Sequence, residues 1–180
     1  MSAPGPAPLI LTLTLDAVSQ AFFDEQRRKY FPPKINYLSA HLTLFHALPG
    51  AEQAAIVAHL AAVAAQQPGP LPLQVTGVKF MGRGVMYTLD SPTLPPLHKR
   101  LQQHWQAWLT AQDQQGLRAH ITAQNKVDPA VARLLHEELA ADFQPFVAQG
   151  TGLALWAYRG GPWELQQQFI FAEKEPGTKQ

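Results

Sequence analysis

The spacing of apolar residues along the chain switches repeatedly between the period of a strand and the period of a helix. Residues 9–15, LILTLTL, alternate with a period of two, which is typical of a strand. In residues 97–112, Leu97, Leu101, Trp105 and Trp108 recur at helical spacing. The two periods predict strands at 9–15, 37–48, 71–80, 85–89, 118–127, 151–158 and 163–172, and helices at 17–30, 52–66, 97–112 and 129–143.

Proline, glycine and capping residues place the boundaries of these elements. Asp128-Pro129 combines a capping carboxylate with a proline at the first helical position, so a helix is expected to begin there. The proline-rich segment 91–96 is the expected junction between two lobes, and residues 1–8 and 174–180 are expected to be flexible tails. The whole chain, 1–180, is therefore predicted to be one domain.

A four-residue motif occurs twice. Ala40-His41-Leu42-Thr43 and Ala119-His120-Ile121-Thr122 lie 79 positions apart, and each is followed by a helix and a pair of strands at nearly the same offset. The duplication predicts an α+β, bilobal fold with two pseudo-symmetric lobes. Each lobe is expected to hold a small antiparallel sheet backed by helices, and the two His-x-Thr motifs are expected to meet at a central cleft.

The spacing within each motif is suited to phosphoryl transfer. Residues i and i+2 of a strand point to the same face, so each copy presents one imidazole and one hydroxyl. With an ordinary pKa of about 6.5, one histidine can take a proton from an attacking oxygen while the other donates to the leaving oxygen. Hydroxyls stabilise the charge that develops on phosphate. His41, His120, Thr43 and Thr122 are thus the candidate catalytic residues, and which histidine is the base stays open.

Strand alternation also nominates residues that contact the substrate. Phe45 is expected to share the face of His41 and Thr43, while Arg118, Gln124 and Lys126 are expected to share that of His120 and Thr122. Tyr158, at the final turn, is a further candidate. His46 should point to the opposite face and pack there, and Arg27-Arg28-Lys29 is either a solvated helix end or an RNA-contacting segment.

Composition narrows the function without identifying it. Hydrophobic residues make up 46% of the chain and charged residues 15%, as in a globular protein. A net charge of +1 argues against a grip on long nucleic acid but permits a short phosphate-bearing ligand. The chain has no cysteine and no H-E-x-x-H motif, so we expect no metal site and no cofactor. The start of the sequence does not resemble a secretory signal, and no apolar run is long enough for a membrane span.

The paired motifs resemble those of the 2H phosphoesterase superfamily, in particular its bacterial 2′-5′ RNA ligase or cyclic phosphodiesterase branch. The likeness covers roughly 9–172 and includes Tyr30-Phe31-Pro32, the segments 41–46 and 120–126, and the closing segment 155–164. The resemblance implies metal-free catalysis on RNA ends or nucleotides, with the two histidines as an acid/base pair and the two threonines as phosphate ligands. The sequence departs from the family in Ala123, where a larger apolar residue is usual, and in Asn125 and Lys126, where many relatives carry an arginine.

We therefore predict a monomeric, cytoplasmic enzyme that opens 2′,3′-cyclic phosphates of RNA ends or small nucleotides to 2′-phosphates and also performs 2′-5′ ligation in reverse. Two alternatives remain at this point. One is a small-nucleotide hydrolase acting on ADP-ribose cyclic phosphate or 2′-5′ oligoadenylate. The other is a non-catalytic module that binds nucleotides or RNA ends.

Overall fold

The computed structural model describes residues 5–172; residues 1–4 and 173–180 lie outside this range, and they include the expected C-terminal tail 174–180. Two short 3₁₀ turns connect elements near the motifs, and a third, Gln106–Trp108, follows α3. The strands are β1 (Leu9–Leu15), β2 (Leu42–Leu48), β3 (Leu71–Phe80), β4 (Val85–Asp90), β5 (His120–Gln124), β6 (Phe146–Ala157) and β7 (Glu164–Ile170). The helices are α1 (Ala17–Tyr30), α2 (Gln53–Gln66), α3 (Leu94–His104) and α4 (Pro129–Asp142).

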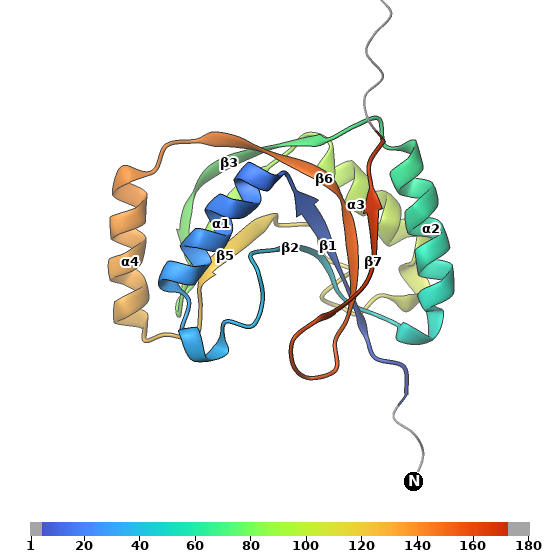
Figure 1. Cartoon of the computed structure of the whole chain (residues 1–180), viewed down its shortest axis with the longest axis horizontal. Coiled ribbons are helices and arrows are strands. Elements are labelled where there is room, and N and C mark those ends of the chain that lie inside the picture. The colour runs from blue at the N-terminus through green and yellow to red at the C-terminus, as the bar shows by residue number, and fades with distance from the viewer. Residues whose placement is uncertain (1–4, 173–180) are drawn as a thin grey trace, which may run out of the picture.

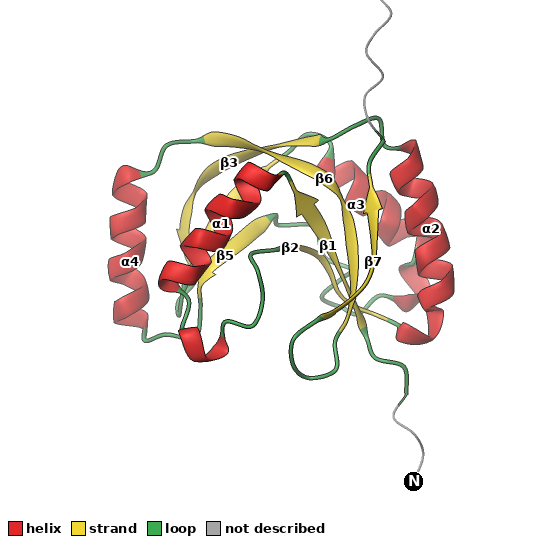
Figure 2. Ribbon diagram, in the orientation of Figure 1, coloured by secondary structure: helices red, strands yellow, loops and turns green. Residues whose placement is uncertain are grey.

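The seven strands form one antiparallel sheet in the order β2-β1-β6-β3-β4-β5, with β7 paired to β6. β6 joins the two halves of this sheet, because its beginning pairs with β3 and its remainder pairs with β1 and β7. Figure 2 shows the sheet curling into an arch. The prediction of a bilobal α+β fold is confirmed, with the two expected small sheets continuous through β6.

Helices cover the sheet at both of its ends, as Figure 1 shows. α1 and α4 lie on the side of β3, β4 and β5, whereas α2 packs on β6 and β7. α2 buries a narrow apolar stripe that includes Ile56, Leu60 and Val63. α1 is capped by Asp16, which accepts a hydrogen bond from the backbone N–H of Ser19 at 2.9 Å. α1 also packs against β5, so this helix contacts the second motif strand directly.

Several boundaries differ from the sequence prediction: the strand expected from residue 37 begins at Leu42, and the strand expected from residue 151 begins at Phe146. The helix predicted at 97–112 begins at Leu94 and ends at His104, with Pro95 and Pro96 in its first turn. Proline is tolerated there because the first-turn N–H groups have no partner within the helix. At the N-terminus, Ala7 packs against the core and the Pro8 carbonyl accepts a hydrogen bond from Tyr158 N–H at 3.0 Å. The segment expected to be a flexible leader up to residue 8 is thus part of the fold from Ala7.

The helix predicted to start at Asp128-Pro129 is confirmed as α4. The Asp128 carboxylate accepts a hydrogen bond from Ala130 N–H at 2.9 Å, and Pro129 occupies the first helical position. α4 packs against β3 and β4, which places its start immediately beyond the end of β5. The cap at Asp128 therefore starts the helix that follows the second motif strand.

Candidate functional site

The two motif strands are the end members of the strand order, and the curl of the sheet brings them into contact with each other. His41 immediately precedes β2, and His120 is the first residue of β5. Thr43 and His120, from different copies of the motif, line one small hollow of about 130 Å³. The topology therefore brings one residue from each copy of the motif to the same hollow.

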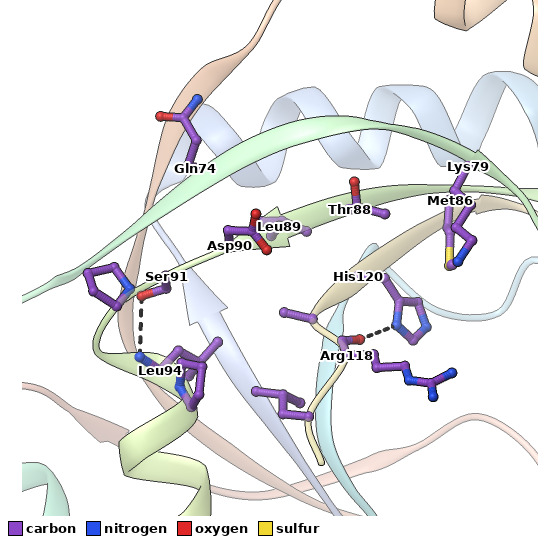
Figure 3. Close-up of a pocket in the computed structure, with 14 residues that line it drawn as sticks. Gln74, Lys79, Met86, Thr88, Leu89, Asp90, Ser91, Leu94, Arg118 and His120 are labelled. Atoms are coloured by element: carbon purple, nitrogen blue, oxygen red, sulfur yellow. Dashed lines mark hydrogen bonds between the residues drawn. The ribbon is translucent and has the colours of Figure 1, made fainter. Parts of the chain in front are cut away.

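Both motif histidines are held in the same way. His41 Nδ1 lies 2.8 Å from the Ser39 carbonyl oxygen, and His120 Nδ1 lies 2.7 Å from the Arg118 carbonyl oxygen (Figure 3). A carbonyl only accepts, so in each ring Nδ1 carries the hydrogen and donates it. Nε2 is left as the nitrogen that can take or give a proton at the site.

The peptide before His41 is held from both sides by α1. Asp24 accepts a hydrogen bond from Ala40 N–H at 2.7 Å, and the Gln20 amide donates to the Ala40 carbonyl at 2.9 Å. Because His41 is not itself paired in a strand, these bonds fix the backbone that carries its ring. α1 thus has a direct role in positioning the first motif.

The surroundings of His41 disfavour its charged form. Burial lowers the pKa of His41 to about 4; the hydrogen bond to Ser39 opposes this, and the nearby charges of Arg27, His120 and His46 lower it further. The indole of Trp163, on the turn between β6 and β7, covers the ring at a centroid distance of 4.6 Å. Contrary to the expectation of an ordinary imidazole pKa, His41 is neutral at neutral pH.

Arg27 is the buried member of the basic cluster at the end of α1, and only 5% of its surface is exposed. Its guanidinium donates to the Leu38 carbonyl at 3.0 Å and to the Thr122 carbonyl at 3.3 Å, and it lies over the Phe31 ring. It therefore links the loop before the first motif to the strand of the second. Arg28, in contrast, is exposed and paired with Glu25. Neither expectation therefore describes the whole cluster, because one arginine is solvated and the other is buried between the two motifs.

A β-bulge follows the threonine in both motif strands. In the β1–β2 pairing, Thr12 faces Thr43 and Leu11 faces Phe45, so Leu44 is the extra residue. In the β4–β5 pairing, Met86 faces Thr122 and Val85 faces Gln124, so Ala123 is the extra residue. A bulge interrupts the alternation of faces. The residues that follow it therefore face the opposite way from what a regular strand would give.

These two bulges overturn two of the predicted substrate contacts. Phe45 is fully buried, stacked on His98 and edge-on to Trp105, and Gln124 is buried with 5% exposure. Neither side chain is available to a substrate. His46, expected on the opposite face, instead lines the hollow of Thr43 and His120, and a regular-strand reading misses it.

The other nominated residues are placed differently from one another. Arg118 lies in the hollow with Thr43 and also in a larger one, of about 720 Å³, beside His120 (Figure 3). Lys126 is exposed beyond the end of β5, with a left-handed φ of 61°, and Tyr158 is exposed after β6. Neither lines a hollow described next to the motifs.

A second large hollow, of about 440 Å³, adjoins His41. Tyr37, Trp156 and Trp163 supply its aromatic lining, and Gln168 of β7 contributes an amide. Sequence reasoning missed Trp163 because nothing in the spacing shows that the last turn folds back onto the first motif. Two hollows of different chemistry thus flank the histidines, one aromatic and one lined by Lys79 and Arg118.

Within residues 5–172, no cluster of three or more His, Asp or Glu side chains is arranged to hold a metal ion. None of the helices in this same range has the length and apolar character required to cross a membrane.

Several solved structures share this fold. A Thermus thermophilus protein, TT0787, matches with a TM-score of 0.62 and 16% identity, over 93% of this chain and 100% of its own. Escherichia coli LigT complexed with NADP⁺ matches with a TM-score of 0.58 and 19% identity, over 94% and 99%. LigT complexed with ATP matches with a TM-score of 0.56 and 21% identity, again over 94% of this chain and 99% of its own. At these identities the likeness concerns the fold.

Among curated proteins, none matches the sequence significantly. The family model described as the 2′-5′ RNA ligase superfamily, in contrast, matches residues 15–162, which include both motifs and the strands that carry them. This chain belongs to the 2′-5′ RNA ligase superfamily, the 2H phosphoesterases.

Proposed function

We propose that the chain is a metal-independent phosphodiesterase that opens 2′,3′-cyclic phosphates on RNA ends or nucleotides, and that the same site performs 2′-5′ ligation in reverse. One observation carries the proposal: each copy of the motif supplies an imidazole whose Nδ1–H is held by the carbonyl two residues earlier. Two such rings at one phosphate are the requirement for paired acid/base catalysis.

In this proposal His41 is the general base and His120 the general acid. The low pKa of His41 keeps its Nε2 unprotonated and able to take the proton of the attacking water. The water oxygen forms a bond to phosphorus, the bond from phosphorus to the ribose 3′ oxygen breaks, and His120 donates a proton to that oxygen. The product is a 2′-phosphate. In ligation, the 5′ hydroxyl of a second RNA end takes the place of water, and the same proton transfers give a 2′-5′ linkage.

The threonine hydroxyls and the two hollows complete the proposed site. Thr43 and Thr122 donate hydrogen bonds to non-bridging phosphate oxygens, where charge builds during the reaction. The hollow at Trp163 and Tyr37 offers aromatic faces for stacking a base, and the hollow at Arg118 offers positive charge. Nucleotide binding by this fold has a precedent, since LigT structures contain NADP⁺, ATP and 3′-AMP.

The test is a product-resolved assay on 2′,3′-cyclic nucleotides and on RNAs with cyclic-phosphate, 2′-5′ or 3′-5′ ends. Phosphorus NMR should show a 2′-phosphomonoester, and turnover should persist after exhaustive chelation with EDTA. A 3′-phosphate as the main product would refute the orientation, and rescue of an EDTA-inactivated enzyme by a divalent ion would refute the metal-independent mechanism. Binding without turnover of any of these substrates would indicate a binding module instead.

A further inference from the structure

His46 and Asp113 form an imidazole–carboxylate pair beside the two motifs. His46 Nδ1 lies 3.1 Å from an Asp113 oxygen, and the Asp113 side chain is 1% exposed while that of His46 is 45% exposed. The buried carboxylate therefore stands behind a half-exposed ring. The ring itself lines the hollow that also holds Thr43 and His120.

Asp113 has a structural function that does not need the imidazole. Its carboxylate accepts backbone N–H bonds from His46 at 2.8 Å and Ala47 at 2.9 Å, where the β1–β2 register slips a second time. Any residue other than proline at position 46 would donate the same backbone hydrogen. These contacts explain why an acid is buried here but not why the side chain at position 46 is an imidazole.

The pair fixes the tautomer of His46. Burial raises the pKa of the Asp113 carboxyl, but hydrogen bonds from the His46 ring and from the backbone N–H groups of His46 and Ala47 lower it to a value below the ordinary one. An ionised carboxylate only accepts hydrogen bonds, so His46 Nδ1 carries the hydrogen. Nε2 is thus left available, as in His41 and His120, and no described group is hydrogen-bonded to it.

The shared hollow is suited to an oxyanion. Thr43, His46, Arg118 and His120 are among the residues that line it, and so is Asp113. The Asp113 charge lies behind the His46 ring and is occupied by hydrogen bonds. Hydrogen bonds from imidazole to a phosphate oxygen are strengthened by the charge of the acceptor.

We propose that His46, held by Asp113 through its Nδ1–H, is a third phosphate-contacting histidine, which binds as the doubly protonated imidazolium and donates its Nε2–H to a non-bridging phosphate oxygen on the Thr43–His120 side of the site. His46 thereby helps hold the substrate phosphate while His41 and His120 transfer protons. The inference rests on the proposed function for the identity of the substrate. Its binding test uses inorganic phosphate as the probe and does not depend on that identity.

Two substitutions separate contact from structure. In His46→Asn the amide takes the place of Nδ1 and can still donate to Asp113, but nothing replaces Nε2. In His46→Gln the amide reaches the place of Nε2. We expect His46→Asn to lower kcat/KM on a 2′,3′-cyclic nucleotide by about 10- to 100-fold, which is the cost of one lost hydrogen bond to a charged group. His46→Gln should recover most of that loss.

The matched control is His104→Asn, at an exposed histidine at the end of α3 that lines none of the hollows described next to the motifs. It should leave kcat/KM unchanged. Unfolding curves of the two His46 variants should agree with that of the wild type, because Asp113 keeps its backbone partners. If His46→Asn retains wild-type kcat/KM, the ring does not contact the substrate phosphate and the proposal is wrong.

A binding measurement on the wild-type protein keeps the test independent of turnover and of how the variants fold. Titration with inorganic phosphate, followed by imidazole nitrogen NMR, should shift the Nε2 resonance of His46 together with that of His120. A His46 Nε2 resonance that does not move at saturation would overturn the inference. Phosphate binding at His46 without turnover of any cyclic phosphate would support this contact and reject the proposed function.

Discussion

Replacing Trp163 by alanine should raise the pH at which the enzyme loses activity in acid. The base must be unprotonated, so kcat/KM falls as the pH drops through the pKa of free-enzyme His41. That pKa is about 4, and burial, to which the Trp163 ring contributes at 4.6 Å, is the main cause. The acidic limb of the wild-type profile is therefore expected near pH 4.

The largest possible shift of the acidic limb is the difference between the pKa of His41 and the ordinary pKa of an imidazole. Full exposure would return the pKa of His41 from about 4 to its ordinary value of 6.5. Trp163→Ala removes one wall of the enclosure, while the charges of Arg27, His120 and His46 stay in place. We expect the acidic limb to move upward by about one pH unit, which corresponds to about 1.4 kcal/mol in favour of the imidazolium.

The assay is kcat/KM on a 2′,3′-cyclic nucleotide from about pH 3.5 to about pH 8, with circular dichroism at each pH to monitor folding. Tyr158→Ala is the control, because it removes an aromatic ring from the same turn that does not stack on His41. A Trp163→Ala limb coincident with the wild type, or a wild-type limb near pH 6.5, would refute the assignment of a desolvated His41 as base. The acidic limb of the kcat profile should lie at a higher pH than that of the kcat/KM profile, since a bound phosphate favours the imidazolium form of His41.

Three further predictions concern the motifs and their support. His41→Ala and His120→Ala should each lower kcat at least ~10²-fold without unfolding, and a folded variant with half its activity would contradict the two-histidine mechanism. Thr43→Ala and Thr122→Ala should raise the activation free energy by about 2.7–4 kcal/mol in steady-state kinetics, whereas unchanged kinetics would leave the threonines as strand residues only. Gly84→Ala would place its Cβ against the Gln124 backbone and should lower the free energy of unfolding by about 1–3 kcal/mol in a denaturant titration; an unchanged midpoint would show that β5 moves aside freely.

The sequence by itself predicted most of the secondary-structure elements and nominated the two His-x-Thr motifs as the candidate site. Strand and helix periods, the Asp128-Pro129 cap and the motif duplication are local patterns, and β1, α1, α2 and α4 agree with them closely. The pairing of His with Thr at i and i+2 is local as well. These features depend only on neighbours along the chain, so they can be predicted without the fold.

Only the tertiary structure decided which side chains surround the motifs. The bulges at Leu44 and Ala123 arise from registers set by β1 and β4, so alternation along one strand misplaced Phe45 and Gln124 and concealed His46. The same holds for Arg27, whose burial depends on a carbonyl of β5 that lies 95 residues later in the chain. Face, burial and charge environment are properties of contacts between distant segments, and a period along one segment does not contain them.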